Sequence, residues 1–232
     1  MALPSRWSFA MFVAGGALLG ATMIAWLIRV LWIVAQSARA TKRIPRLPAP
    51  LALPVGAARA GAGRVECVSG QAPVAFCHGG LRPSILVSTG LVSELSADEL
   101  VAVLAHEQHH VGRGDPLRRA IQQAMADVLF WLPVVHWWAD RRREASELAA
   151  DRAAIRRAGR PPLAAALWKV GSYLETNSAA AFAGVAELRV AQLLGDDLRR
   201  QQIPMSLWMG SAAGVLIALN SAWCVAHLIG SA

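Results

Sequence analysis

The sequence predicts a mainly α-helical membrane protein, in which two transmembrane helices flank a domain that combines helices with a small β-sheet. Hydrophobic residues make up 55% of the 232-residue chain and charged residues only 16%, whereas about a quarter of a typical soluble domain is charged. Two apolar runs, at 8–35 and 205–230, are long enough to cross a bilayer as helices. Between them, short apolar stretches separated by turn residues predict strands, and helical patterns follow.

The first apolar run contains Arg29 as its only charged residue. A helix of about 20 apolar residues spans the hydrocarbon core, so this run is long enough. A cleavable signal peptide is the alternative, but its apolar region has only about 7–15 residues. We therefore predict a retained transmembrane anchor at residues 1–38.

Basic residues follow this run directly, at Arg39, Lys42, Arg43 and Arg46. The second apolar run is preceded by arginines and followed by no Lys or Arg. By the positive-inside tendency, we expect a multi-pass protein of a bacterial inner membrane, with both termini outside and the intervening domain in the cytoplasm. Because the basic residues flank apolar runs, we interpret the net charge of +8 as contact with the lipid bilayer and expect no direct nucleic-acid binding.

The expected domain organisation has three further parts. Residues 39–63, rich in Pro, Ala and basic residues, read as a linker, residues 64–203 as the folded domain and residues 204–232 as a C-terminal transmembrane helix. The domain opens with short strands between 64 and 90, and Ser96 with Glu99 forms a capping box that begins a helix running to about Gly112.

The apolar segment 117–139 is harder to interpret, because its length approaches that of a span. Arginines stand on both sides of it, and Asp127, Pro133 and His136 interrupt it. We predict a core or membrane-surface helix there. Further helices are expected at 139–158, 163–175 and 184–200.

A metal site is predicted by the segment His106-Glu-Gln-His-His110, which matches the pattern H-E-x-x-H. Histidines four apart share one face of a helix, so His106 and His110 can hold one Zn²⁺. Glu107 can then act as a general base toward water, as in metallopeptidases with this motif. His109 lies on another face and is not expected to be a ligand.

A catalytic zinc needs a third protein ligand and an open position. Residues 143–151 read Arg-Glu-Ala-Ser-Glu-Leu-Ala-Ala-Asp and offer Glu144 and Glu147. Glu147 and Asp151 are four apart and share a helical face, so Glu147 can bind the metal while Asp151 accepts a hydrogen bond from a ligand histidine. We expect Arg113 and Asp115 either to pair with each other or to support the end of the helix.

Residues 73–152, about a third of the chain, resemble the zinc region of the BlaR/MecR-type antirepressor metallopeptidases, a gluzincin family. The shared features are Gly80-Leu-Arg-Pro-Ser-Ile, Ser-Ala-Asp-Glu-Leu100, H-E-x-x-H-x-x-R-x-D, the apolar FWLPVVHWW and E-x-x-x-D. The resemblance implies a zincin-like fold, a Zn²⁺ cofactor, Glu147 as third ligand and endopeptidase activity toward a protein or peptide, such as a DNA-binding repressor.

The resemblance has departures. The receptors of that family carry a C-terminal sensor domain, whereas this sequence ends soon after its last apolar run, so we expect it to lack direct drug sensing. A separate sensor subunit or a second copy of the chain are open alternatives. The HtpX and CAAX prenyl proteases share both motifs, but their His-Pro-Pro segment before a later Arg-Ile is absent here. Glu187-Leu-Arg189-Val resembles a remnant of that segment, which implies a supporting role for Arg189.

Three functions are compatible with these residues: a regulatory zinc endopeptidase that cuts a cytoplasmic repressor, an HtpX-like quality-control protease, and a non-catalytic zinc-binding scaffold. The β-strand around Cys77 could present its edge to an extended substrate peptide. The intact Glu107 argues against the scaffold, because a binding module needs no base.

Overall fold

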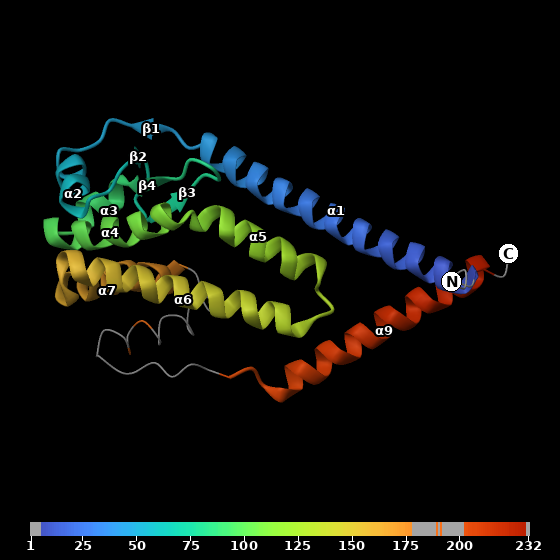
Figure 1. The fold of residues 1–232 in the computed structure, drawn as a ribbon. Coiled ribbons are helices and arrows are strands. Elements are labelled where there is room, and N and C mark those ends of the chain that lie inside the picture. Colours follow the sequence, from blue (N-terminus) through green and yellow to red (C-terminus); the bar gives the residue numbers. More distant parts are fainter. Residues whose placement is uncertain (1–5, 178–188, 190, 192–201, 231–232) are drawn as a thin grey trace. The chain divides into compact units, whose positions relative to one another are not determined.

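The computed structural model describes residues 6–177, 189, 191 and 202–230, and they form two compact units. The helical unit comprises residues 1–33, 121–141 and 201–232, and the sheet unit comprises residues 34–120 and 142–200. The mainly helical architecture, with a small mixed sheet and two candidate spans, confirms the predicted fold class (Figure 1).

Two of the described helices are long and apolar enough to cross a membrane. They are α1, Arg6–Lys42, with a candidate span at Phe12–Lys42, and α9, Met205–Gly230, with a candidate span at Met205–Val225. Only 6% of each apolar window is buried inside the protein. Their side chains therefore leave large apolar faces uncovered, as expected of helices that contact lipid.

The sheet unit contains four strands in the order β1-β2-β4-β3. The strands are β1 Arg46–Leu47, β2 Val65–Val68, β3 Ala75–His78 and β4 Ser84–Ser88. β2 and β4 run parallel, and the other two pairs are antiparallel. The whole of β4 is buried, which explains its continuous apolar pattern, while β3 lies at an edge of the sheet.

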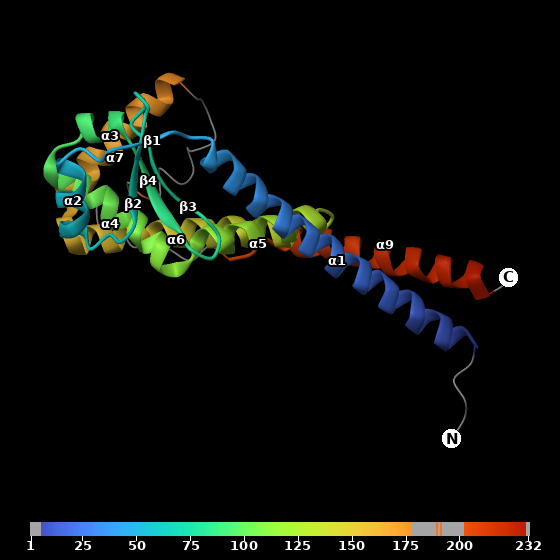
Figure 2. The same cartoon turned by 90° about the horizontal axis from the view of Figure 1, so that it is seen from above.

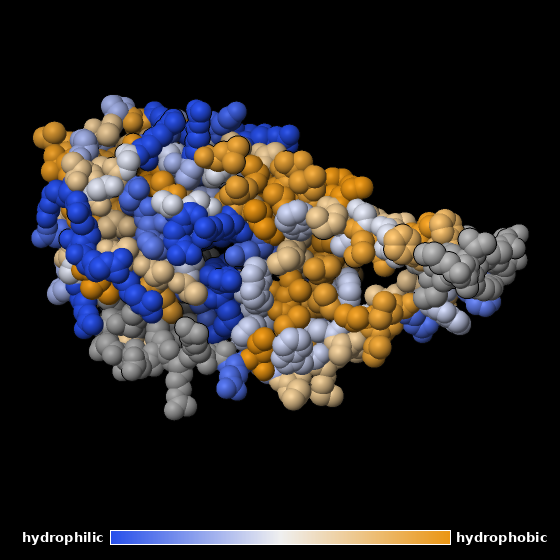
Figure 3. Space-filling view, viewed as in Figure 1, coloured by the Kyte–Doolittle hydropathy of each residue, from blue (hydrophilic) through white to orange (hydrophobic). Residues whose placement is uncertain are grey.

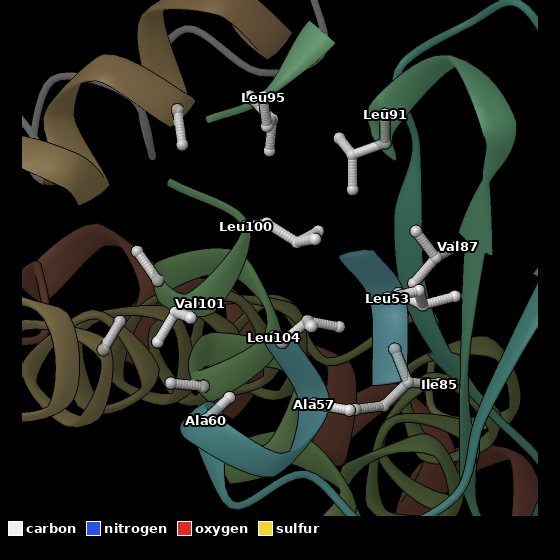
Figure 4. Close-up of a cluster of buried hydrophobic side chains, with 14 of the residues drawn as sticks. Leu53, Ala57, Ala60, Ile85, Val87, Leu91, Leu95, Leu100, Val101 and Leu104 are labelled. Carbon is white, nitrogen blue, oxygen red and sulfur yellow. The ribbon is translucent and has the colours of Figure 1, made fainter. Parts of the chain in front are cut away.

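Helix α4, Ala97–Arg113, is the middle layer of the sheet unit (Figures 1 and 2). The sheet and α2, Ala52–Ala60, lie on one side of it, and α6, Pro133–Ala158, and α7, Arg160–Asn177, lie on the other. Figure 4 shows the core that holds α4 in place, where leucines of α4 meet side chains of α2 and of the central strand β4. This arrangement leaves one face of α4 for the polar residues of the predicted motif.

The beginning and end of α4 agree with the sequence. The Ser96 side chain accepts the backbone N–H of Glu99, and the Glu99 carboxylate accepts the N–H of Ser96, which confirms the predicted capping box. Gly114, with a φ of 64°, ends the helix in a left-handed conformation that favours glycine. Helix α5, Asp115–Val128, begins directly after it.

The structure differs from the sequence prediction in two places. The expected linker at 39–63 contains α2, whose Leu53 and Ala57 are buried in the core. The expected single helix at 117–139 is instead the end of α5, a turn at 129–132, and the beginning of α6. Pro133 explains the break, because it has no N–H to continue a helix and is favoured at a first helical position.

Two of the other three predicted helices are present in the structure, and the third falls mostly outside the described residues. Those at 139–158 and 163–175 lie within α6 and α7. The helix expected at 184–200 lies outside the described residues, except for two positions. The proposed domain boundaries stay a prediction.

Helix α3, Thr89–Glu94, contains a glycine that fixes the loop leading to β3. The Gly90 N–H donates to the carbonyl of Gly70 at 2.7 Å, and a Cβ atom on Gly90 would lie 2.0 Å from the carbonyl oxygen of Gln71. We expect Gly90→Ala to lower the free energy of unfolding by about 1–3 kcal/mol, because backbone must move. Chemical denaturation in detergent micelles measures this change.

Gly112→Ala is the matched control, since nothing lies within 4 Å of a Cβ atom there and the residue is helical. It should be neutral or stabilising by up to about 1 kcal/mol. Equal destabilisation by both substitutions would contradict the close approach at Gly90.

Candidate metal centre

The two predicted histidines project from the second half of α4 and are both buried. The structure brings them together with Glu147 of α6. The Nε2 atoms of His106 and His110 are 3.2 Å apart, and they lie 3.3 and 3.5 Å from the two carboxylate oxygens of Glu147. Among the described residues, these three side chains form the one group of His, Cys, Asp or Glu whose donor atoms converge closely enough to hold a metal ion.

These distances fit a tetrahedral zinc ion. Zinc binds nitrogen and oxygen at about 2.0–2.2 Å, so the ligand atoms of a tetrahedral site stand about 3.3–3.5 Å apart. The 3.2 Å between the two Nε2 atoms is close to one edge of such a tetrahedron. Each Nε2 is nearest to a different oxygen of Glu147, at 3.3 and 3.5 Å, and with one donor atom from each residue all three lie within 4.8 Å of one another. Three ligands leave the fourth position for water or a substrate.

Carboxylates on the far side of both imidazole rings set the orientation of the rings. His106 donates its Nδ1–H to Asp151 at 2.9 Å, and His110 donates its Nδ1–H to Asp115 at 2.7 Å. Each Nε2 is therefore left without a proton and directed at the metal position when the rings are neutral. Asp151 lies where the sequence predicted, on α6 one turn after Glu147.

Asp115 has two closer partners besides the expected one. The predicted ion pair with Arg113 is present at 3.8 Å, and His110 and the hydroxyl of Ser146 donate to Asp115 at 2.7 and 2.5 Å. The position of Asp115 at the first residue of α5 explains this, because Gly114 turns the chain back toward His110. Arg113, whose side chain is half exposed, is at the margin of the site.

Two arginines approach the carboxylates. Arg189 donates through Nε and Nη2 to both oxygens of Asp151, at 2.7 Å each, so the residue suggested by its sequence context is at the site. Arg119 donates to Glu147 at 2.6 Å and was not predicted. A sequence signal existed, since Asp115 and Arg119 are four apart and share one face of α5.

Glu107 lies beside the metal position and lines the same cavity, which has a volume of about 270 Å³. Its carboxylate accepts the backbone N–H of Cys77, at the edge of the sheet. Burial, reinforced by the negative charge of Glu147, raises the pKa of Glu107 despite the opposing charges of His106 and Arg119. His109 is not part of this group, and it faces a separate hollow with Gln108 and Arg113.

Without a metal ion, the pKa values of the two histidines are shifted in opposite directions from that of a free imidazole. Burial lowers the pKa of His106, but the hydrogen bonds to Asp151 and Glu147 outweigh this effect and raise it to about 9. Burial and the neighbouring charge of His106 lower the pKa of His110 to about 4. The pKa of Glu147 is lowered, because the histidines and Arg119 outweigh its burial.

The assignment of Glu147 as third ligand is testable against Glu144. We expect Glu147→Gln to weaken zinc binding by more than the roughly 10–100-fold that loss of a supporting partner causes. Glu144→Gln makes the same chemical change on the same helix and should leave the affinity unchanged. Chelator competition on purified protein measures both, and loss of zinc from the Glu144 variant alone would refute the assignment.

Zinc binding should also release a proton near neutral pH. At pH 7.5 His106, with its pKa of about 9, carries a proton that zinc must displace, whereas His110, with a pKa of about 4, is already neutral. We expect about one proton more per zinc at pH 7.5 than above about pH 10, where His106 is already neutral. Calorimetry in two buffers of different ionisation enthalpy counts the protons.

Asp151→Asn should reduce the number of protons released at pH 7.5, since it removes a hydrogen bond that raises the pKa of His106. A binding enthalpy that is independent of the buffer in the unsubstituted protein would show that His106 is neutral before zinc binds.

Comparison with known proteins identifies the family to which the chain belongs. A family model described as BlaR1 peptidase M56 matches residues 16–185. The chain is also similar to curated proteins named "Protease HtpX homolog": 42% identical over 73 residues in Janthinobacterium sp. (30% of this chain, 25% of the relative), and 40% over 88 residues in Bordetella pertussis (36% and 30%). These matches span less than a third of the relatives' length. Because the family model covers well over half of the chain, the chain belongs to the BlaR1 peptidase M56 family.

Proposed function

We propose that this protein is a membrane-bound zinc endopeptidase. The main support for this proposal is the convergence of the two Nε2 atoms and the Glu147 carboxylate closely enough to hold one metal ion, with Glu107 in the same cavity. A zinc ion held by these ligands would act as a Lewis acid toward water and a peptide carbonyl. Family membership and the similarity to proteases support the same reaction class.

Glu107 is the proposed general base. A buried carboxylate with a raised pKa accepts a proton from water and returns it to the leaving amine more readily than an exposed one. Arg119 and Arg189 hold the neighbouring carboxylates in place, so the base is surrounded by groups of fixed position.

The cavity indicates how a substrate would bind. β3 is an edge strand, and its Ala75, Phe76 and Cys77 line the cavity. An extended peptide could pair with this open edge and so pass in front of the metal position. Leu163, Leu167 and Val170 of α7 line the same cavity and would favour an apolar side chain next to the scissile bond.

Two kinds of substrate are compatible with this reaction. The M56 family membership and the predicted resemblance to BlaR/MecR-type antirepressors support cleavage of a cytoplasmic repressor, with the catalytic domain in the cytoplasm. The similarity to HtpX homologues supports an alternative role in membrane-protein quality control about equally well. Comparing protein fragments in cells with and without the active enzyme separates them, since regulation predicts one soluble substrate and quality control predicts many membrane proteins.

Replacing Glu107 tests the reaction. We expect Glu107→Gln to reduce cleavage of an unfolded protein by about 10²–10⁴-fold, the usual contribution of a general base, while bound zinc is retained. Glu94→Gln, the same change at an exposed position, serves as the control. Proteolysis by the detergent-purified protein is measured alongside its zinc content.

The possible results separate the hypotheses. Loss of cleavage with zinc retained supports the enzyme. Equal cleavage by both variants would show that Glu107 is not the base. Zinc binding without cleavage by the unsubstituted protein would favour a non-catalytic scaffold.

A further inference from the structure

The turn between α5 and α6 is an apolar feature that the proposed reaction does not use. The run from Val128 to Ala139 contains no Asp, Glu, Lys or Arg. It belongs to the helical unit together with both candidate spans. The side chain of Phe130, in the turn, is 72% exposed. Figure 3 shows hydrophobic surface over this part of the protein.

The turn packs against a groove of small residues on α9. A Cβ atom on Gly214 would lie 2.7 Å from the carbonyl oxygen of Trp131, and one on Gly210 would lie 3.5 Å from Pro133. The hydroxyl of Ser211, which is buried, accepts the backbone N–H of Val134 at 3.1 Å. Small residues at this spacing allow close backbone approach within membranes.

These contacts lie well inside the candidate span of α9. Gly214 is nine residues after Met205, which corresponds to about 14 Å along the helix. The full helix of 26 residues is about 39 Å long and exceeds a hydrocarbon core of about 30 Å by about 9 Å. Even if all the excess lies before Gly214, this residue is about 5 Å inside the hydrocarbon.

The other candidate span also holds this hairpin. Arg29 of α1 pairs with Asp127 of α5 at 2.7 Å, and the amide of Gln123 donates to the same carboxylate at 2.8 Å. The indole N–H of Trp26 donates to the carbonyl of Ile121 at 3.4 Å. A charge within a membrane span requires a partner, and Asp127 provides one for Arg29.

Several backbone N–H groups in and beside the turn are paired, which lowers the cost of placing the turn in lipid, where unpaired N–H and C=O groups are costly. Leu129 and Leu132 donate to carbonyls of the hairpin at 2.9 Å, as does Val135 at 3.0 Å. Val134 donates to Ser211, and Pro133 has no N–H to satisfy.

We propose that residues 128–139 enter the hydrocarbon region as a re-entrant hairpin, with Phe130 against the acyl chains and the turn seated on Gly210, Ser211 and Gly214 of α9. The lipid bilayer is its partner, because the exposed apolar surface of the turn continues that of the two spans it contacts. The hairpin is then a third membrane element beside α1 and α9.

A nitroxide spin label at Phe130→Cys tests this depth in vesicles of phosphatidylcholine and phosphatidylglycerol. The full-length protein first has its own cysteines, Cys67, Cys77 and Cys224, replaced by alanine. Power saturation by oxygen and by a water-soluble nickel complex gives the depth. The reference labels are Leu216→Cys, exposed on α9, and Leu81→Cys, 90% exposed in the sheet unit.

We expect the label at 130 to match the label at 216, with strong relaxation by oxygen and weak relaxation by nickel. A label at 130 that lies in the headgroups or in water, as expected at 81, overturns the proposal. Weak relaxation of the label at 130 by both reagents would show that protein, and not lipid, covers the turn, and would also overturn the proposal.

Gly214→Val tests the seat on α9. It should move the label at 130 toward water, because a side chain there would displace Trp131. Gly20→Val is the matched control on α1, where nothing lies within 4 Å of a Cβ atom, and should leave the depth unchanged. A label that stays equally deep in both variants would contradict the proposed seating.

Discussion

The site depends on one constraint: two imidazoles from the same helix must direct their Nε2 atoms at a single point. Spacing along α4 places the rings side by side, but each ring could still rotate or carry its proton on either nitrogen. Asp151 and Asp115 remove that freedom by accepting both Nδ1–H groups. Because these carboxylates come from α6 and α5, three helices must meet for the metal position to exist.

Much of this arrangement could be predicted from local sequence. The capping box, the two histidines, and the placement of Glu147 and Asp151 on one helical face all depend on residues three or four apart. Helical geometry places residues with this spacing on the same side of a helix. The ion pair of Asp115 with Arg113 follows from the sequence, but its closer bond to His110 could not be predicted in the same way, because it depends on the turn at Gly114. Arg119 was missed because its partner, Glu147, is 28 residues away.

Helix α2 shows a different limit of sequence reasoning. Its composition, rich in Ala, Gly and Pro, is typical of a linker, yet the small residues are what allow close packing on α4. A Cβ atom on Gly56 would lie 3.2 and 3.3 Å from side-chain atoms of Leu100 and Leu104. A segment of small residues can therefore be either a flexible linker or a helix that packs closely on a neighbour. Only the presence of a partner surface distinguishes the two. The break before Pro133 was visible as an interruption, but its consequence was not, since proline is compatible with either a kink or a new helix.

The charges around the cavity support a divalent cation independently of the distances. Four carboxylates, those of Glu107, Asp115, Glu147 and Asp151, surround it, against the two guanidinium groups of Arg119 and Arg189. With neutral histidines this leaves two negative charges in excess, which a divalent ion would balance. Without the metal, a proton on His106, whose pKa is raised to about 9, offsets part of this negative charge. Shifted pKa values of this kind are expected in a site whose negative charge is balanced only when the metal ion is bound.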